Sequence, residues 1–300
     1  MHRLLRCMPW GDVMASRSDE QDNSAQIAYW NDRAAVTWTA FQERLDALFE
    51  PLTALALDAA APAQGEHAID VGCGCGATVL ALGDRVGPTG RVLGLDVSHP
   101  MAGRARERIA ASGLSNAQVV VSDAATHDFA GAGVDLLFSR FGVMFFADPV
   151  AAFANLRRAV RPGGRLLCAA WRPIEDNPWF RVPLEAARGV LPPQPAADPD
   201  APGPFAFANP DRTRGMLDRA GWQDVTLIRH DVPMQFAAAG QIEQATDFAT
   251  RVGALARILA DEGPEVRARA RAAVAEALRS LDGPGGINLT GSIWLISARP

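Results

Sequence analysis

The sequence lacks an excess of positive charge, and it lacks any long apolar run. Its 300 residues hold 29 Lys and Arg against 34 Asp and Glu, a net charge of −5. Without a basic stripe, nucleic acid is not expected as a partner or substrate. No segment approaches the roughly 18 uninterrupted apolar residues of a transmembrane helix, so no membrane span is expected.

Cysteine is also scarce, with only Cys7, Cys73, Cys75 and Cys168. Cys73 and Cys75 form a C-x-C pair, but a metal site would need two further ligands nearby, and none is found. We therefore expect no metal, and we interpret the pair as small side chains that fit a tight turn. Residues 1–10 contain no apolar run of signal-peptide length, which favours a reducing, cytoplasmic location.

The N-terminal part divides into a polar tail and a helical region. Residues 1–24 are expected to be a disordered tail, in which Met1 and Met14 are both possible starts. Residues 25–300 are expected to form a single domain that begins with helices over 25–62, broken in two at Pro51. Two interpretations stay open for Tyr29 and Trp38. They pack on the sheet, or they close over a bound cofactor and its substrate.

Residues 68–77, AIDVGCGCGA, form the most informative stretch. An apolar run, three alternating glycines and a helical pattern predict a strand, a tight turn and a helix, the first unit of a doubly wound α/β domain. Glycine allows backbone to approach a ligand closely. Gly72, Gly74 and Ala77 also satisfy a relaxed dinucleotide fingerprint. Asp70 would, however, repel a pyrophosphate and would suit a cationic cofactor.

The pattern Asp-x-Gly-x-Gly-x-Gly resembles motif I of the class I S-adenosylmethionine (SAM) dependent methyltransferases, a group that includes quinone-ring methyltransferases. The resemblance covers residues 65–171, and more loosely 205–230 and 287–298. It implies a Rossmann-like sheet of seven strands, the last antiparallel, with helices on both sides. Insertions at about 172–208 and 234–286 would lie over the active site as lids.

Acidic residues follow the next two predicted strands. Asp96 ends a strand over 91–95 and lies where a ribose-binding carboxylate should fall, although it could also be the acid of a helix N-terminus. Val97 and Met101 would lie beside the adenine. The resemblance implies that Asp123 receives the adenine amino group and that the N–H of Ala124 supports the ring. It also implies that Asp70 lies near the cofactor's amino group and that Gly72, Gly74 and Gly76 give close backbone.

The fourth predicted strand, 134–138, runs into Ser139, Arg140 and Phe141. This strand end should overlook the methyl group, with Ser139 at the cofactor and Phe141 at the substrate. Arg140 is a charge at the pocket mouth, and it either binds an anionic group of the substrate or pairs with a nearby acid. His127, His230 and Arg140 are candidate bases by location only, and no catalytic base is assigned.

The predicted function is transfer of a methyl group by in-line displacement, with S-adenosylhomocysteine as product. The insertions carry aromatic residues, which favours a small, apolar or aromatic acceptor. Two alternatives remain. One is an NAD(P)-dependent oxidoreductase, in which Asp70 would have no use, and the other is a non-catalytic SAM-binding subunit that binds a partner. The sequence leaves the oligomeric state open.

Overall fold

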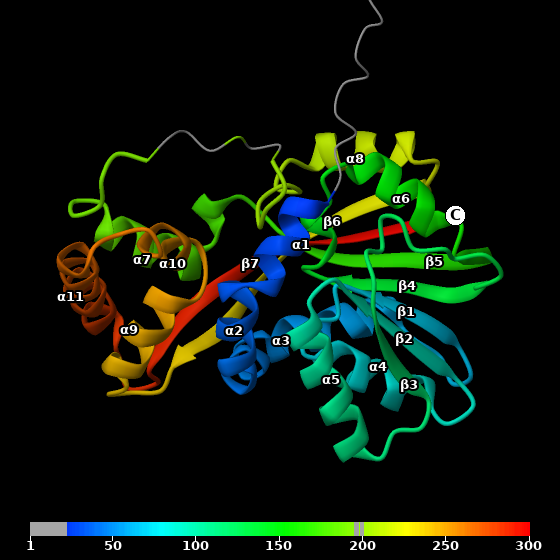
Figure 1. The fold of residues 1–300 in the computed structure, drawn as a ribbon, viewed down its shortest axis with the longest axis horizontal. Helices are drawn as coiled ribbons and strands as arrows, with labels where there is room; N and C mark the ends of the chain where they lie inside the picture. The colour runs from blue at the N-terminus through cyan, green and yellow to red at the C-terminus, as the bar shows by residue number, and fades with distance from the viewer. Residues whose placement is uncertain (1–22, 195–197, 199–200) are drawn as a thin grey trace, which may run out of the picture.

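The computed structural model describes residues 23–194, 198 and 201–300. These residues form one seven-stranded sheet with helices on both faces and a helical lobe at one end (Figure 1). The strands are β1 His67–Val71, β2 Arg91–Asp96, β3 Ala117–Val121, β4 Val134–Arg140, β5 Val160–Trp171, β6 Gln223–Ala237 and β7 Ile287–Arg299. The helices are α1 Ser24–Asn31, α2 Arg33–Ala40, α3 Gln42–Ala60, α4 Ala77–Val86, α5 His99–Ser112, α6 Pro149–Arg157, α7 Pro178–Ala187, α8 Pro210–Arg219, α9 Ile242–Arg251, α10 Ala254–Leu259 and α11 Pro264–Leu281.

The strand order is β3-β2-β1-β4-β5-β7-β6, in which β7 runs antiparallel to both of its neighbours. The predicted doubly wound sheet with an antiparallel last strand is therefore confirmed. The chain order of the parallel strands reverses between β1 and β4. In such sheets, ligands bind beyond the carboxyl ends of the strands at this switch point.

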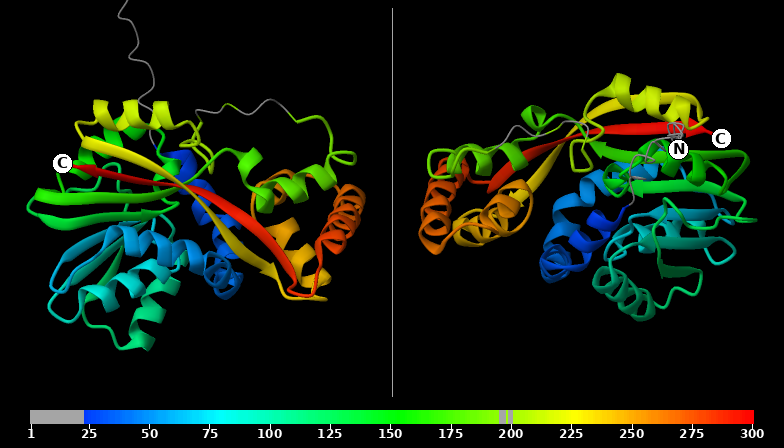
Figure 2. Two further views of the ribbon diagram at one scale, coloured as in Figure 1. Left: turned by 180° about the vertical axis from the view of Figure 1, so that it is seen from behind. Right: turned by 45° about the horizontal axis from the view of Figure 1, so that its top comes forward.

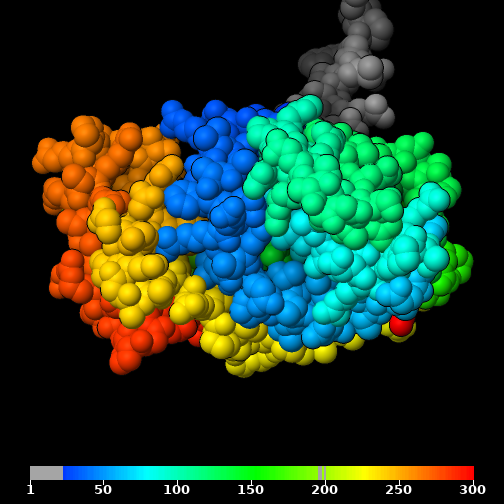
Figure 3. Space-filling model, turned by 90° about the horizontal axis from the view of Figure 1, so that it is seen from below, coloured from blue at the N-terminus to red at the C-terminus, as the bar shows by residue number. Residues whose placement is uncertain are grey.

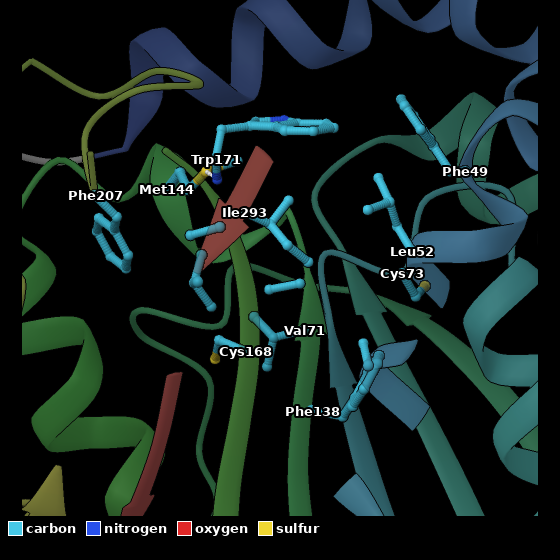
Figure 4. Close-up of a cluster of buried hydrophobic side chains, with 14 of the residues drawn as sticks. Phe49, Leu52, Val71, Cys73, Phe138, Met144, Cys168, Trp171, Phe207 and Ile293 are labelled. Atoms are coloured by element: carbon cyan, nitrogen blue, oxygen red, sulfur yellow. Dashed lines mark hydrogen bonds between the residues drawn. The ribbon is translucent and has the colours of Figure 1, made fainter. Parts of the chain in front are cut away.

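The inner parallel strands β1, β2 and β4 are buried on both faces along most of their length, as their apolar runs predict, whereas β3 at the edge of the sheet buries only Val119. β1 is buried from Ala68 to Val71. Helices α4 and α5 lie along one face of the sheet, and α6 and α8 lie along the other (Figures 1 and 2). In the core, Phe49 and Leu52 of α3 lie on one side of the strands and Phe207 lies on the other (Figure 4). This core fixes the strand ends that carry the predicted site.

The N-terminal region forms three helices, and the prediction that Pro51 divides it was wrong. Pro51 lies inside α3, and the chain instead turns at Asp32 and Phe41. Leu48, Phe49 and Leu52 of α3 are buried around the proline. Packing of this apolar face on the sheet outweighs the cost of one missing backbone hydrogen bond.

Strands β6 and β7 extend well beyond the parallel strands and carry a helical lobe. Met234, Phe236 and Ala237 are buried in the part of β6 that lies beyond His230. Helix α7 and helices α9, α10 and α11 pack around this extension (Figures 1 and 2). The expected lid segment 172–208 thus contains α7, and the expected lid segment 234–286 contains α9, α10 and α11.

Most of the predicted disordered tail, and both candidate start residues, lie outside the described residues; α1 begins at Ser24. Among the helices of the described residues, none combines the length and apolar character needed to cross a membrane.

The loops that follow β1 and β4 touch at the switch point. Gly72 has a φ of +69°, and a Cβ atom there would lie 2.5 Å from the Cα of Gly142. The hydroxyl of Ser139 donates to the carbonyl of Val71 at 2.7 Å and accepts the N–H of Gly142 at 3.2 Å. The two loops are therefore held together by a direct backbone contact that only glycine permits.

We predict that Gly72→Ala destabilises the protein by about 2–4 kcal/mol, because it combines a left-handed conformation with a backbone clash. Urea unfolding would measure this change. The matched control is Gly103→Ala in α5, where a Cβ atom meets nothing within 4 Å. This control should be neutral or more stable by up to about 1 kcal/mol. Equal midpoints for wild type and Gly72→Ala would contradict the contact.

Candidate cofactor and active site

The glycine loop between β1 and α4 is tightly wound. Gly72, Gly74 and Gly76 have φ values of +69°, +55° and +85°. The N–H of Gly72 donates to the carbonyl of Leu95 at 2.8 Å, which binds the loop to the end of β2. A Cβ atom on Gly76 would lie 2.9 Å from the Cβ of Ala105 in α5. The alternation of glycines thus reflects real limits on space and conformation at all three positions.

Asp96, at the end of β2, is bound to this loop. One carboxylate oxygen accepts the N–H of Gly74 at 2.7 Å, and the other accepts the N–H of Ser98 at 2.8 Å. Burial raises the pKa of Asp96, and the backbone N–H groups of Ser98, Gly74 and Val97 act in the opposite direction. A carboxylate accepts up to about four hydrogen bonds, so Asp96 can still accept from a ligand. A ribose hydroxyl is a donor of the kind that fits.

Asp70 is fully buried and only half satisfied. One oxygen accepts a hydrogen bond from the hydroxyl of Thr78, and the other has no partner. Burial raises the pKa of Asp70 to about 7. A buried carboxylate with a free oxygen is costly, and a bound ammonium group would offset that cost.

Arg140, predicted as a charge at the pocket mouth, contacts helix α3. Its side chain donates to the hydroxyl of Thr53 in α3 at 2.5 Å and lies over the ring of Phe49 at 5.5 Å. Its Nε is buried without a partner, and burial lowers the pKa of its guanidinium. The attraction of Asp70 and Asp46 acts in the opposite direction, but no carboxylate of the described residues forms a salt bridge with it. The protein thus holds an incompletely paired cation near the incompletely paired Asp70.

Asp123, after β3, already has a side-chain partner. The amide nitrogen of Asn23 lies 2.9 and 3.0 Å from its two oxygens, and the N–H of Ala125 donates to one of them at 2.9 Å. Ala124 beside it is buried. Sequence reasoning missed Asn23, because it stands in a polar stretch that we expected to be disordered.

Helix α1 crosses the strand ends that carry these acids (Figure 1). The side chain of Asn31 donates to the carbonyl of Val97 at 2.8 Å and accepts the N–H of His99 at 2.9 Å. Trp30, which the prediction did not single out, contacts Tyr29, Trp38 and Phe145 through edge-to-face ring pairs. Tyr29 and Trp38 thus belong to one aromatic cluster with Trp30 and Phe145.

The remaining predicted residues lie at the same edge of the sheet. Met101 is buried, and its methyl group would lie 3.1 Å from a Cβ atom on Gly74. Ser139 is buried, and its hydroxyl is already used within the protein. Phe141 has a φ of +67°, rare for a residue with a side chain, and its ring stacks on Trp171 with centroids 4.0 Å apart. Strain of this kind is often found at functional sites.

The two candidate histidines lie apart from this centre. His127 shares a 2.9 Å hydrogen bond with the hydroxyl of Ser122, and its ring packs edge-on against Phe129. His230 lies on β6, opposite Ile293 of β7, which itself lies opposite Trp171 at the end of β5. Within the part of the chain that the structure describes, neither histidine forms a hydrogen bond, ion pair or ring contact with Asp70, Arg140 or Phe141, so no catalytic base is assigned.

A polar network around the glycine loop was not predicted either. Arg108 of α5 donates to the carbonyl of Cys75 at 2.6 Å and pairs with Asp46 of α3 at 2.7 Å. Gln42 joins this network by donating to Asp46 at 2.6 Å, and Arg104 donates in turn to the side-chain oxygen of Gln42 at 3.1 and 3.2 Å. A hollow of about 640 Å³, bordered by Thr39, Gln42 and Arg104, lies beside the network. On this face of the molecule, the blue N-terminal helices lie against the cyan segments around α5 (Figure 3).

These features fit a nucleoside cofactor that carries an amino acid. The carboxyl ends of β1, β2 and β3 present three carboxylates in turn, and Asp70 and Arg140 add an unsatisfied acceptor and an unsatisfied donor. A buried acid before the glycine turn fits a SAM-binding protein better than a dinucleotide-binding one, because Asp70 would repel a pyrophosphate and attract the ammonium group of SAM.

Comparison with known proteins agrees. Residues 68–164 match the family model described as a methyltransferase domain. The chain is 29% identical over 199 residues to nocamycin O-methyltransferase from Saccharothrix syringae, covering 64% of this chain and 71% of that protein. It is 29% identical over 171 residues to demethylmenaquinone methyltransferase from Shouchella clausii, covering 54% and 73%. The structure of YcgJ from Bacillus subtilis matches with a TM-score of 0.53 at 16% identity, covering 82% of this chain and 97% of YcgJ.

The chain is therefore a class I SAM-dependent methyltransferase. The expected family, activity and cofactor are confirmed, and the oxidoreductase alternative is not favoured.

We predict that Asp70 makes the ligand-free protein less stable as the pH rises. Its native pKa of about 7 exceeds the unfolded value of 3.8, so the native state binds the proton more tightly. The contribution of protonated Asp70 to the free energy of unfolding is fully present below about pH 4 and is lost as the pH rises through 7. Asp70→Asn should remove this loss, which is at most about 4 kcal/mol. Urea unfolding of wild type and Asp70→Asn from about pH 5 to about pH 8 would measure this loss. If the free energies of unfolding of the two proteins change with pH in the same way, the prediction is wrong.

Proposed function

We propose that this methyltransferase acts on a small, apolar or aromatic molecule bound beyond the ends of β4 and β5. The observation that carries this proposal is the aromatic wall at that place. The stacked rings of Phe141 and Trp171 are joined by Trp179 and Phe180 of α7, with ring centroids of 5.3 and 5.4 Å to Trp171. Such a wall suits a flat apolar molecule, and the names of the two relatives agree with a small acceptor.

The acidic residues at the strand ends would hold the nucleoside part of the cofactor. Asp96, which the backbone N–H groups of Gly74 and Ser98 hold in place, would accept from the ribose hydroxyls. Asp123 would accept the adenine amino group, with Ala124 beside the ring. Val97 and Met101 would flank the adenine. Ser139 would act indirectly, by fixing the distance between the loops after β1 and β4.

The amino-acid part of the cofactor would lie between Asp70 and Arg140. Its ammonium group would supply the partner that the free oxygen of Asp70 lacks. Its carboxylate would supply the partner that Arg140 lacks, and the half-buried position makes this contact stronger than one at the surface. This assignment differs from both sequence-based interpretations of Arg140, and it is supported by the unpartnered Nε of Arg140 and by the attraction between Arg140 and Asp70.

The bound cofactor supplies an electrophilic methyl group on a sulfonium, whose leaving group is already activated. The residues of this chain then have to orient the acceptor and exclude water. The stacked Phe141 and Trp171 would set the plane of the acceptor ring. Helix α1 and the lobe around α7 and α9 would keep water away.

The cellular location, the lack of nucleic-acid binding and the domain organisation are also proposed. The free thiols of Cys73, Cys75 and Cys168 support a reducing, cytoplasmic location. The net charge of −5 supports a protein that does not bind nucleic acid. We treat residues 25–300 as a single domain in which the lobe segments 172–208 and 234–286 shape the acceptor pocket.

Calorimetric titration tests the cofactor assignment. We predict that S-adenosylhomocysteine and SAM bind and that NADH does not. Asp96→Ala should weaken both S-adenosylhomocysteine and 5′-methylthioadenosine, which share the ribose, by about tenfold or more. Arg140→Met should weaken only S-adenosylhomocysteine by a similar factor, because methylthioadenosine lacks the amino-acid part. Retained binding of methylthioadenosine serves as the control for correct folding.

If Arg140→Met binds S-adenosylhomocysteine as wild type does, the assignment of Arg140 is wrong. A search for methyl transfer to small phenols and quinone precursors then tests the acceptor. Cofactor binding without transfer to any of them would favour the non-catalytic alternative.

A further inference from the structure

The side chain of Asn23 is fully engaged by two distant segments. Its amide nitrogen donates toward both oxygens of Asp123, at 2.9 and 3.0 Å. Its carbonyl oxygen accepts the N–H of Ala147, in the segment between β4 and α6, at 2.7 Å. A short side chain thus joins the residues that follow β3 and β4 to the start of α1.

The chemistry of this contact matches that of the nucleobase. A carboxamide NH₂ and the amino group of adenine are both neutral, planar donors, and a carboxylate accepts either in the same way. The nitrogen of Asn23 lies at nearly equal distances from both oxygens of Asp123, so it covers the outer edge of the carboxylate. The N–H of Ala125 occupies a further position on one oxygen. A second amino group cannot approach that edge while Asn23 stays.

We propose that Asn23 takes the place of the adenine amino group in the ligand-free enzyme, and that helix α1 is a strap which cofactor binding releases at this end. The inference rests on the proposed role of Asp123 as the acceptor for adenine. It assigns to Asn23 a role in admitting the cofactor, through competition for one carboxylate.

Helix α1 can open at its N-terminal end. It has only eight residues and buries none of them, and the ring contacts of Trp30 with Trp38 and Phe145 lie near its other end. Little apolar contact therefore opposes movement at the end that carries Asn23. Its other end is held independently, because Asn31 bonds to the carbonyl of Val97 and to the N–H of His99. Tyr29 lies under the guanidinium of Arg257 in α10, at 4.6 Å. Release of Asn23 therefore does not require the whole helix to leave.

Hydrogen exchange at the backbone N–H of Ala147, measured by NMR on the unaltered protein, is the direct test. Without ligand, this N–H should be protected by the carbonyl oxygen of Asn23. Saturating S-adenosylhomocysteine should accelerate its exchange by about tenfold or more, because Asn23 leaves. Unchanged or slower exchange at Ala147 in the saturated protein would overturn the proposal.

Substitution gives an independent test. Asn23→Asp keeps an oxygen for the N–H of Ala147 but places a carboxylate where the donor was, against Asp123. We expect this variant to bind S-adenosylhomocysteine about three- to tenfold more tightly and to associate with it faster. Weaker binding would instead mean that Asn23 clamps the bound cofactor, and the proposal would be wrong.

Asn31→Ala is the matched control, because it frees the opposite end of the same helix and leaves the amide of Asn23 on Asp123. Its gain in affinity should be smaller than that of Asn23→Asp, and an equal gain would overturn the proposal. These measurements distinguish a wrong cofactor assignment from a wrong role for Asn23. If the wild type and both variants fail to bind S-adenosylhomocysteine, the cofactor assignment fails. If they bind it while Ala147 stays protected, only the strap fails.

Discussion

The contact between Gly72 and Gly142 at the switch point is the constraint on which the site depends. It places the loop after β1 against the loop after β4, with the hydroxyl of Ser139 bonded to both. The same geometry puts Asp70 just before one loop and Arg140 and Phe141 at the start of the other. A side chain at either glycine would separate the loops. Asp70, Arg140 and Phe141 would then lose their mutual positions.

The site that this contact assembles is electrostatically incomplete. Asp70 has one unpartnered oxygen, and Arg140 is bonded to a neutral hydroxyl rather than to a carboxylate. Each arrangement costs stability in a protein interior, and the raised pKa of Asp70 expresses that cost. A zwitterionic ligand would remove both defects at once. The hydrophobic core around β1, β4 and β5 gives the fold enough stability to hold this imbalance in the free protein.

The sequence predicted the sheet well because parallel strands leave strong local signals. Apolar runs, turn glycines and acids at the strand ends located Asp70, Asp96 and Asp123 from the chain alone, since carboxyl ends of parallel strands share one edge. The sequence did not predict the partners of these residues. Arg108 reaches Asp46 across 62 positions and Asn23 reaches Asp123 across 100. Such pairs depend on side-chain direction and helix placement, which local patterns do not contain.

Helix α1 also connects the two halves of the proposed reaction. Through Asn23 and Asn31 it touches the residues that follow β2 and β3, where the nucleoside would bind. Through Tyr29 it touches Arg257 in the lobe that would cover the acceptor. A cation–π contact of this kind is worth only about 0.5–1 kcal/mol when exposed, so it favours contact between α1 and the lobe but is weak enough to break. One short helix with no buried side chain can thus respond to the cofactor on one side and to the acceptor cover on the other.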